Sequence, residues 1–237
     1  MDRLVKSLSL LLSYPTAALQ GALPEIAAEI VEDRRLAPGT RSTLAELTGL
    51  LDREDLFDLE ENYVLLFDRS RTLSLNLFEH IHGESRDRGG AMVSLLETYR
   101  AAGYEPDTCE LPDHLPALLE FLSTQPAAFC KETLADAAHI LAALQARLVR
   151  RHSGYAAVFT ALLELSEANI DSATLSQILE QPEVDPNDLA ALDDVWEESE
   201  VQFGPSPDAG CPQAREMLAK MSDPETRAAP AAPATGR

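Results

Sequence analysis

The chain has 237 residues, of which 45% are apolar and 25% are charged. This composition is typical of a soluble globular protein. Forty acidic residues against nineteen basic ones give a formal charge of −21. A negative field of this size repels nucleic-acid phosphates and anionic lipids, so we expect neither as a partner.

Targeting signals and disulfide patterns are missing from the printed sequence. Asp2 and Lys6 interrupt the apolar start in a way that does not suit a signal peptide, and no run of about 18 uncharged apolar residues follows. We therefore expect a cytoplasmic protein without direct membrane insertion. Cys109, Cys130 and Cys211 are odd in number and lack CxxC spacing, which argues against a disulfide framework and a structural zinc site.

Leucine dominates the apolar residues and favours helices. It occurs 38 times, whereas the β-branched valine and isoleucine together occur 15 times. Proline and glycine fall between stretches with helical spacing, and no stretch alternates with a period of two. We expect an all-α protein, a single compact helical bundle of about eight or nine helices over residues 1–170. In chain order, the apolar stretches cover residues 4–12, 19–31, 44–51, 56–67, 92–99, 115–122, 134–148 and 155–163.

Residues 171–237 are expected to form an acidic tail and not a second packed domain. They hold more than half of the prolines, and fourteen acidic residues against four basic ones. Leu189, Leu192 and Trp196 share one helical face, which predicts a short amphipathic helix near 188–201. Three alternatives stay open: the helix folds back on the bundle, it holds a partner, or no stable helix forms. The end of the tail is expected to be disordered.

Residues 68–90 interrupt the leucine pattern and gather four of the nineteen basic residues. We expect a loop between two helices. In one interpretation its arginines form local ion pairs, while Ser85 or Asp87 caps the following helix. In the other, the guanidinium groups bind carbonyls or carboxylates of another molecule.

Residues 110–116 also allow two interpretations, one structural and one functional. The prolines on either side of Asp113 favour a helix start, with Asp113 as its cap. The alternative is a polar hinge displayed beside an apolar helix.

Catalytic patterns are weak. The sequence has no GxSxG, P-loop or GxGxxG pattern, and nothing orients His114 toward Cys109 as a base. His80 and His82 could mark a metal-binding helical enzyme, yet His-x-His spacing does not place two imidazoles on one helical face. We expect no enzyme and no cofactor.

The blocks LFDRSRTLSLNLFEHIHGESRDRGGAMVSLLETYRAAGYE and CELPDHLPALLEFLS resemble the NarJ-type assembly chaperones of respiratory nitrate reductase, in the TorD/DmsD group. Glu110 to His114 is similar to that group's Glu-x-Pro-x-Asp-His signature, shortened by one residue. The resemblance is strong over residues 63–125. Residues 194–212 are similar to the family's C-terminal stretch more loosely.

The resemblance implies a non-catalytic chaperone. It would bind the N-terminal segment of the apo catalytic (alpha) subunit of nitrate reductase, and hold it for molybdenum cofactor insertion and membrane docking. Contact with molybdenum cofactor delivery proteins stays open, and a structural subunit of the mature reductase is the remaining alternative. We expect a client-binding groove formed by Tyr63, Phe67, Arg69, Arg71, Phe78, Glu79, His80, His82, Arg86, Arg88, Met92, Asp113 and His114.

Overall fold

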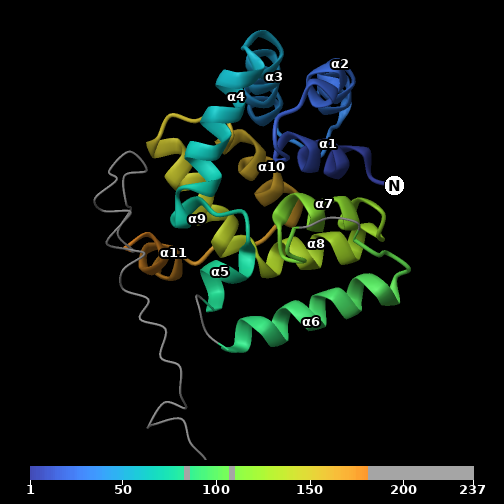
Figure 1. Cartoon of the computed structure of the whole chain (residues 1–237), viewed down its shortest axis with the longest axis vertical. Helices are drawn as coiled ribbons and strands as arrows, with labels where there is room; N and C mark the ends of the chain where they lie inside the picture. Colours follow the sequence, from blue (N-terminus) through green and yellow to red (C-terminus); the bar gives the residue numbers. More distant parts are fainter. Residues whose placement is uncertain (83–85, 107–109, 181–237) are drawn as a thin grey trace, which may run out of the picture. The chain divides into compact units, whose positions relative to one another are not determined.

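A computed structural model describes residues 1–82, 86–106 and 110–180 of the chain. Within these ranges the chain is helical and forms no strand, which confirms the all-α fold class (Figure 1). The α-helices are α1 (Arg3–Leu11), α2 (Ala17–Glu32), α3 (Pro38–Arg53), α4 (Leu56–Tyr63), α5 (Leu77–His82), α6 (Arg86–Ala101), α7 (Leu115–Ser123), α8 (Ala127–Asp136), α9 (Ala138–Arg150), α10 (Ala156–Ser166) and α11 (Ser172–Leu179).

Several helices begin where a short polar side chain caps the first turn. Asp2 accepts a hydrogen bond from the Val5 amide, Thr16 from Leu19, and Asp55 from Phe57. Each bond satisfies one of the amides that the first helical turn leaves without a partner. The start of α3 relies on Pro38 instead, whose fixed φ suits the first helical position.

The core lies where α1 packs against α7, α2 against α3, and α9 against α10. Leu8, Leu119 and Phe159 are fully buried there. Burying one such side chain contributes about 1.5 to 3 kcal/mol before conformational entropy is subtracted. Val31 and Leu50, which the leucine pattern assigns to buried faces, are exposed and do not join the core.

The stretch predicted over 134–148 is two helices and not one. The chain leaves α8 and enters α9 at Ala137, whose ψ of −2° is not that of an α-helix. The buried residues on both sides, Leu134 and Leu141, keep the helical spacing across the break. Alanine favours helix, so the sequence carries no local signal of this break.

The expected loop over residues 68–90 is mostly helical. A π-helical turn, Val64–Asp68, continues α4, and a 3-10 turn, Arg71–Leu73, precedes α5. Helix α6 already begins at Arg86, so Arg88 lies in its first turn. Asp87, expected as a possible cap, also lies inside that turn, where its charge favours the helix N-terminus. The other expected cap, Ser85, lies outside the described residues.

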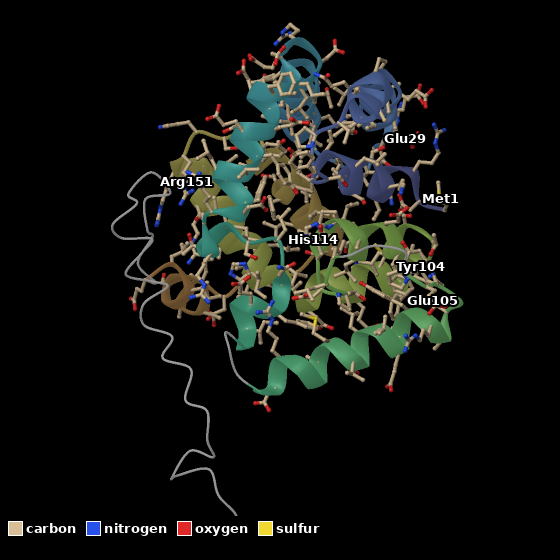
Figure 2. The ribbon with its side chains drawn as sticks, in the orientation of Figure 1. Met1, Glu29, Tyr104, Glu105, His114 and Arg151 are labelled. Carbon is tan, nitrogen blue, oxygen red and sulfur yellow. The ribbon has the colours of Figure 1, made fainter. Side chains whose placement is uncertain are left out.

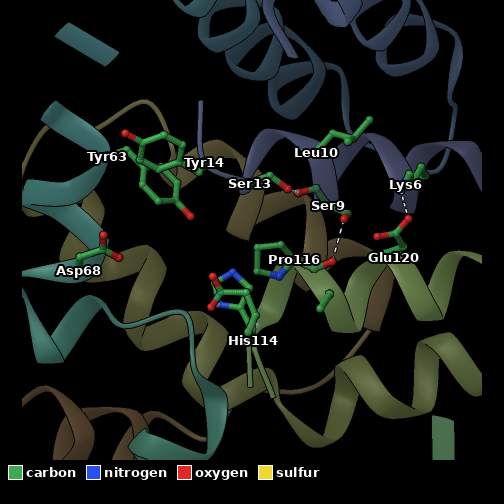
Figure 3. A pocket seen from close by; sticks show the side chains of 12 residues that line it. Lys6, Ser9, Leu10, Ser13, Tyr14, Tyr63, Asp68, His114, Pro116 and Glu120 are labelled. Carbon is green, nitrogen blue, oxygen red and sulfur yellow. Dashed lines mark hydrogen bonds and ion pairs between the residues drawn. The ribbon is translucent and has the colours of Figure 1, made fainter. Parts of the chain in front are cut away.

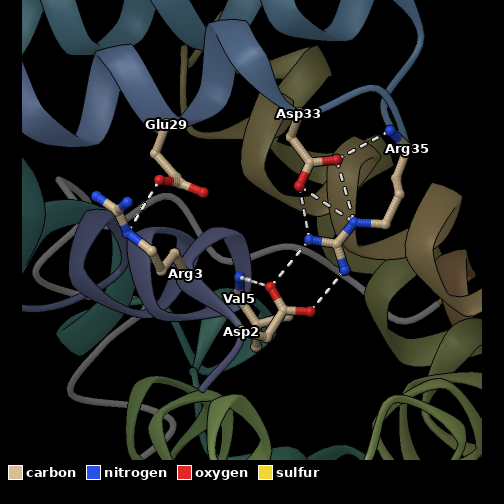
Figure 4. Close-up of polar contacts among 6 residues, drawn as sticks. All are labelled: Asp2, Arg3, Val5, Glu29, Asp33 and Arg35. Atoms are coloured by element: carbon tan, nitrogen blue, oxygen red, sulfur yellow. Dashed lines mark hydrogen bonds and ion pairs between the residues drawn. The ribbon is translucent and has the colours of Figure 1, made fainter.

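Two arginines connect segments that are distant in sequence. Arg35 donates hydrogen bonds to Asp2 and Asp33, which joins the start of α1 to the end of α2 (Figure 4). These bonds hold the pKa of both carboxyl groups below their usual range. Arg147 is fully buried and donates from its two terminal nitrogens to the carbonyls of Thr72 and Ile178, each at 2.8 Å. It thereby ties the 3-10 turn and α11 to α9.

Packed structure continues to α11, beyond residue 170. The proposed tail and its helix near 188–201 fall almost entirely outside the described residues, so this division of the chain remains a prediction. Among the described helices, none has the length and apolar character needed to cross a membrane.

Candidate functional site

The two distinctive blocks of the sequence meet in space through their backbones. The Leu77 amide donates to the Asp113 carbonyl at 3.2 Å, and the Leu115 amide donates to the Leu75 carbonyl at 2.8 Å. Asn76 and His114 lie opposite each other in this short antiparallel contact. The start of α5 and the start of α7 are therefore fixed against each other.

Asp113 organises this junction from a fully buried position. Its Oδ2 accepts a hydrogen bond from the Phe78 amide at 2.8 Å, so it caps α5 across the junction. The sequence predicts a cap for α7 instead, and this is wrong, because the residue before α7 is His114 and its side chain makes no capping bond. Burial raises the pKa of the Asp113 carboxyl group, while the Phe78 amide and the charge of Arg88 oppose the rise.

His80 also belongs to this junction, and its side chain acts there as a hydrogen-bond donor. Its Nε2 lies 2.8 Å from the Ser74 carbonyl, which can only accept, so the neutral ring carries its proton on Nε2. Burial lowers the pKa of His80 despite this bond. Glu79 accepts from the Ser74 hydroxyl at 2.7 Å and lies 3.7 Å from the Nε of Arg71.

A cavity of about 340 Å³ opens beside this junction (Figure 3). Residues of α1, of α4 with its π-helical turn, and of α7 with the segment that enters it form its wall. Figure 2 labels His114 where the chain enters α7. The lining residues are Lys6, Ser9, Leu10, Ser13, Tyr14, Tyr63, Asp68, Glu110, His114, Pro116, Ala117 and Glu120.

Among the charged residues that line the cavity, the acidic ones, Asp68, Glu110 and Glu120, outnumber the one lysine. Burial raises the pKa of Asp68, and the charge of Glu110 raises it further. Burial lowers the pKa of His114, with nearby carboxylates opposing the shift, and its Nδ1 lies 4.0 Å from the Glu110 carboxylate. Lys6, the one lysine of the lining, forms an ion pair with Glu120, which neutralises its positive charge.

Hydrogen bonds and ring contacts hold the walls of the cavity in place. The Tyr63 hydroxyl donates to the Leu12 carbonyl at 2.8 Å, and the Ser9 hydroxyl donates to the Pro116 carbonyl at 2.8 Å. The Tyr63 ring contacts Phe67, with centroids 5.0 Å apart. Such fixed walls form a preorganised site, which reduces the entropy lost on binding.

The structure distributes the expected site residues over several places. Tyr63 and His114 line the cavity, and Phe67 supports it from the core. The junction holds Arg71, Phe78, Glu79, His80 and Asp113, while Arg69 lies in a second hollow. Met92 and Arg88 are half-buried on α6. Arg86 is the first residue of α6, and His82 is the last residue of α5. In the described part of the chain, no three His, Cys, Asp or Glu side chains gather as potential metal ligands.

Sequence analysis missed the contribution of α1 to the cavity. Ser9 lies on α1, a helix otherwise rich in leucine, and Ser13 follows just after the end of α1; both line the cavity. A small polar stripe beside a leucine stripe is the signal that could have indicated this wall. Asp68 and Glu110 were visible in the distinctive blocks, but only the fold shows that they share a cavity.

The chain belongs to the family described as nitrate reductase delta subunit, whose model matches residues 33–161. It is 43% identical over 203 residues to the nitrate reductase molybdenum cofactor assembly chaperone NarJ of Escherichia coli K12, covering 86% of this chain and 85% of that protein. It is 41% identical over 201 residues to NarW of the same strain, a probable nitrate reductase molybdenum cofactor assembly chaperone. This match covers 85% of this chain and 84% of NarW. A probable NarJ of Bacillus subtilis 168 is 30% identical over 164 residues, covering 68% of this chain and 86% of that one.

Proposed function

We propose that this protein is a system-specific assembly chaperone of respiratory nitrate reductase and not an enzyme. It binds the N-terminal segment of the apo catalytic subunit in the cytoplasm. It holds that subunit until the molybdenum cofactor has been inserted and the enzyme docks at the membrane. The cofactor is cargo of the client in this scheme, and the chaperone needs no cofactor of its own.

The names of the relatives support the assembly role, since NarJ and NarW are described as nitrate reductase molybdenum cofactor assembly chaperones. One observation carries the choice of site. The cavity of about 340 Å³ lies where the 63–68 segment and the 110–117 segment meet, and both segments belong to the stretch 63–125 that resembles the chaperone family.

The chemistry of the cavity suits a basic amphipathic segment. Tyr14, Tyr63 and Leu10 offer apolar surface, while Asp68 and Glu110 offer negative charge at its edge. An amphipathic helix can place apolar side chains in such a groove and keep its cationic side chains near the carboxylates. The overall charge of −21 also attracts a basic client over a longer range.

A substitution that fills the cavity tests this proposal. Ala117 is half-buried in the lining of the cavity, so Ala117→Phe places a ring where the client would bind. Ala128→Phe adds the same ring to an exposed position of α8 outside the cavity and serves as the control. Binding of a peptide with the N-terminal sequence of the cognate catalytic subunit is measured by calorimetry.

We expect Ala117→Phe to weaken binding at least about tenfold, which corresponds to about 1.4 kcal/mol. Ala128→Phe should bind as the unmodified protein does, and thermal unfolding should show that both variants fold. Unchanged affinity in Ala117→Phe would contradict the cavity as the client site.

A structural subunit of the mature reductase remains the second candidate, because the family description itself names a subunit. The two functions differ in the lifetime of the complex. A chaperone copurifies with the apo catalytic subunit and is absent from the finished membrane-bound enzyme. A structural subunit is present in the finished enzyme in fixed proportion.

A further inference from the structure

A second hollow of about 290 Å³ lies on the outer side of α4. It is separate from the cavity described above, but Tyr14 lines both of them. The Tyr14 ring is 45% exposed and meets the Tyr63 ring edge-on, with centroids 5.5 Å apart (Figure 3). Tyr14 is therefore a shared wall between the two spaces.

Helix α4 has two different faces. Leu59 and Tyr63 point into the core, and Phe67 continues that buried face in the π-helical turn. The outward face carries Phe57 and Val64, which are seven residues apart and so lie on one side of the helix about 10 Å from each other.

The outward face combines apolar ends with an acidic middle. The Phe57 side chain is 78% exposed, which is unusual for a ring of this size in a protein with a well-packed core. Glu60 and Glu61 lie between Phe57 and Val64, and neither side chain forms a hydrogen bond or an ion pair with another described residue. Arg69 lines the same hollow at its far end.

We propose that this face of α4 is a second contact site for the same client segment, which extends from the cavity past Tyr14. The segment would place an apolar side chain on Phe57 and Val64 and a lysine or arginine on Glu60 and Glu61. Arg69 would donate hydrogen bonds to a client carbonyl or carboxylate. The inference rests on the proposed function and names the chemistry of a client with two apolar anchors separated by positive charge.

Charge decides between this occupant and a second copy of the chain. A copy with a formal charge of −21 would be repelled by an identical charge, and its own α4 would bring further carboxylates to the contact. A cationic segment is attracted to the same surface and satisfies the two glutamates. The spacing of Phe57, Glu60, Glu61 and Val64 matches the i, i+3, i+4, i+7 pattern by which one helix contacts another.

Two variants of the full chain test the inference, each with a matched control on α2. Phe57→Ser removes the exposed ring, and its control is Val31→Ser, which alters another exposed apolar residue. Glu60→Gln combined with Glu61→Gln removes the two charges, and its control is Glu25→Gln combined with Glu32→Gln. Calorimetry with the N-terminal peptide of the cognate catalytic subunit is carried out at low and high salt.

We expect Phe57→Ser to weaken peptide binding about tenfold at both salt concentrations. The double glutamine variant should weaken it about three- to tenfold at low salt and less at high salt, because the lost contacts are exposed ion pairs. The α2 controls should bind as the unmodified protein does, and all variants should keep its melting temperature.

Ala117→Phe separates the two proposals. If Ala117→Phe abolishes binding and both α4 variants bind normally, the second contact site is wrong and the cavity site stands. If none of the three variants changes the affinity, the cavity site fails, and the α4 extension fails with it. Dimerisation that depends on Phe57, with unchanged peptide affinity, would assign the face to a second copy and overturn the inference.

Discussion

At the scale of single residues, buried polar groups connect the distinctive sequence blocks. Asp113 Oδ2 and His80 Nε2 each form a hydrogen bond inside the protein, whereas Asp113 Oδ1 is buried without a hydrogen-bond partner in the described part of the chain. Sequence analysis identified both as site residues, and the structure places them at the α5–α7 junction beside the cavity and not in its lining. We infer that they position the junction, and their substitution should change stability before it changes client contacts.

Asp113 should tolerate asparagine better than alanine. Asp113→Ala leaves the Phe78 amide without its acceptor and should cost about 1 to 3 kcal/mol of unfolding free energy. Asp113→Asn keeps an acceptor oxygen, and burial already favours the neutral acid, so the loss should be smaller. Urea unfolding near pH 7 measures both. Asp171→Ala, which removes the exposed cap of α11, is the control, with an expected cost of about 1 kcal/mol or less. Equal losses for the alanine and asparagine variants at position 113 would contradict the capping role.

His80 should make the protein less stable in mildly acidic solution. Burial lowers its pKa in the folded state below the ordinary value of 6.5, so the unfolded chain binds more protons as the pH falls through 6.5. The stability that the neutral ring contributes is present above this pH and is lost below it. His80→Gln should reduce the change in unfolding free energy between pH 7.5 and pH 5.5, a range of about 2 units around that value.

The pH dependence left in His80→Gln should come partly from His114, whose pKa burial also lowers. His152→Asn, at an exposed position with positive φ that asparagine tolerates, is the control and should keep the full pH dependence. A His80→Gln variant with the same pH dependence as the unmodified protein would show that the ring is not buried in its neutral form.

At the scale of helices, the hydrophobic periodicity predicted where single helices lie. It did not predict how two helices are connected. The leucine stripes located α1, α2, α3, α4, α7, α9 and α10, because each of these helices buries one face. They also located α6, although Tyr99 is the one residue that is buried among those of α6 whose side chains the structure describes. Helix α5 has six residues, too few for a repeated stripe, and alanine hides the break between α8 and α9. The contact between residues 75–77 and 113–115 depends on chain segments that are distant in sequence, which no local pattern reports.

Arg147 is the clearest test of how helices are connected. Arg147→Met fills similar space but leaves the carbonyls of Thr72 and Ile178 without their charged donor. Hydrogen bonds to charged groups contribute about 1.5 to 3 kcal/mol each, so the variant should lose about 3 kcal/mol or more. Amide hydrogen exchange in α11 should become faster.

Arg150→Met changes an exposed arginine on the same helix and should cost within about 1 kcal/mol. Unchanged exchange of the α11 amides in Arg147→Met would mean that α11 is held by other contacts.

At the scale of the whole molecule, charge and composition indicated the kind of partner but not the site. The charge of −21 excluded phosphate and lipid surfaces as expected partners and is compatible with a basic client. The cavity depends on α1, α4 and α7 together, so its shape follows from the fold alone. Six of the residues that line it lie in the two blocks that resemble the chaperone family, whereas the α1 wall does not; they are Asp68, Glu110, His114, Pro116, Ala117 and Glu120.

The central claim is that a preformed, partly apolar and acidic cavity binds the client segment. Titration of the full chain with the N-terminal peptide of the catalytic subunit, repeated at several temperatures and two salt concentrations, tests it most directly. We predict a negative heat-capacity change, because apolar surface is buried, and a moderate loss of affinity at high salt, because the acidic edge is screened. Affinity that vanishes at high salt with no heat-capacity change would contradict the claim.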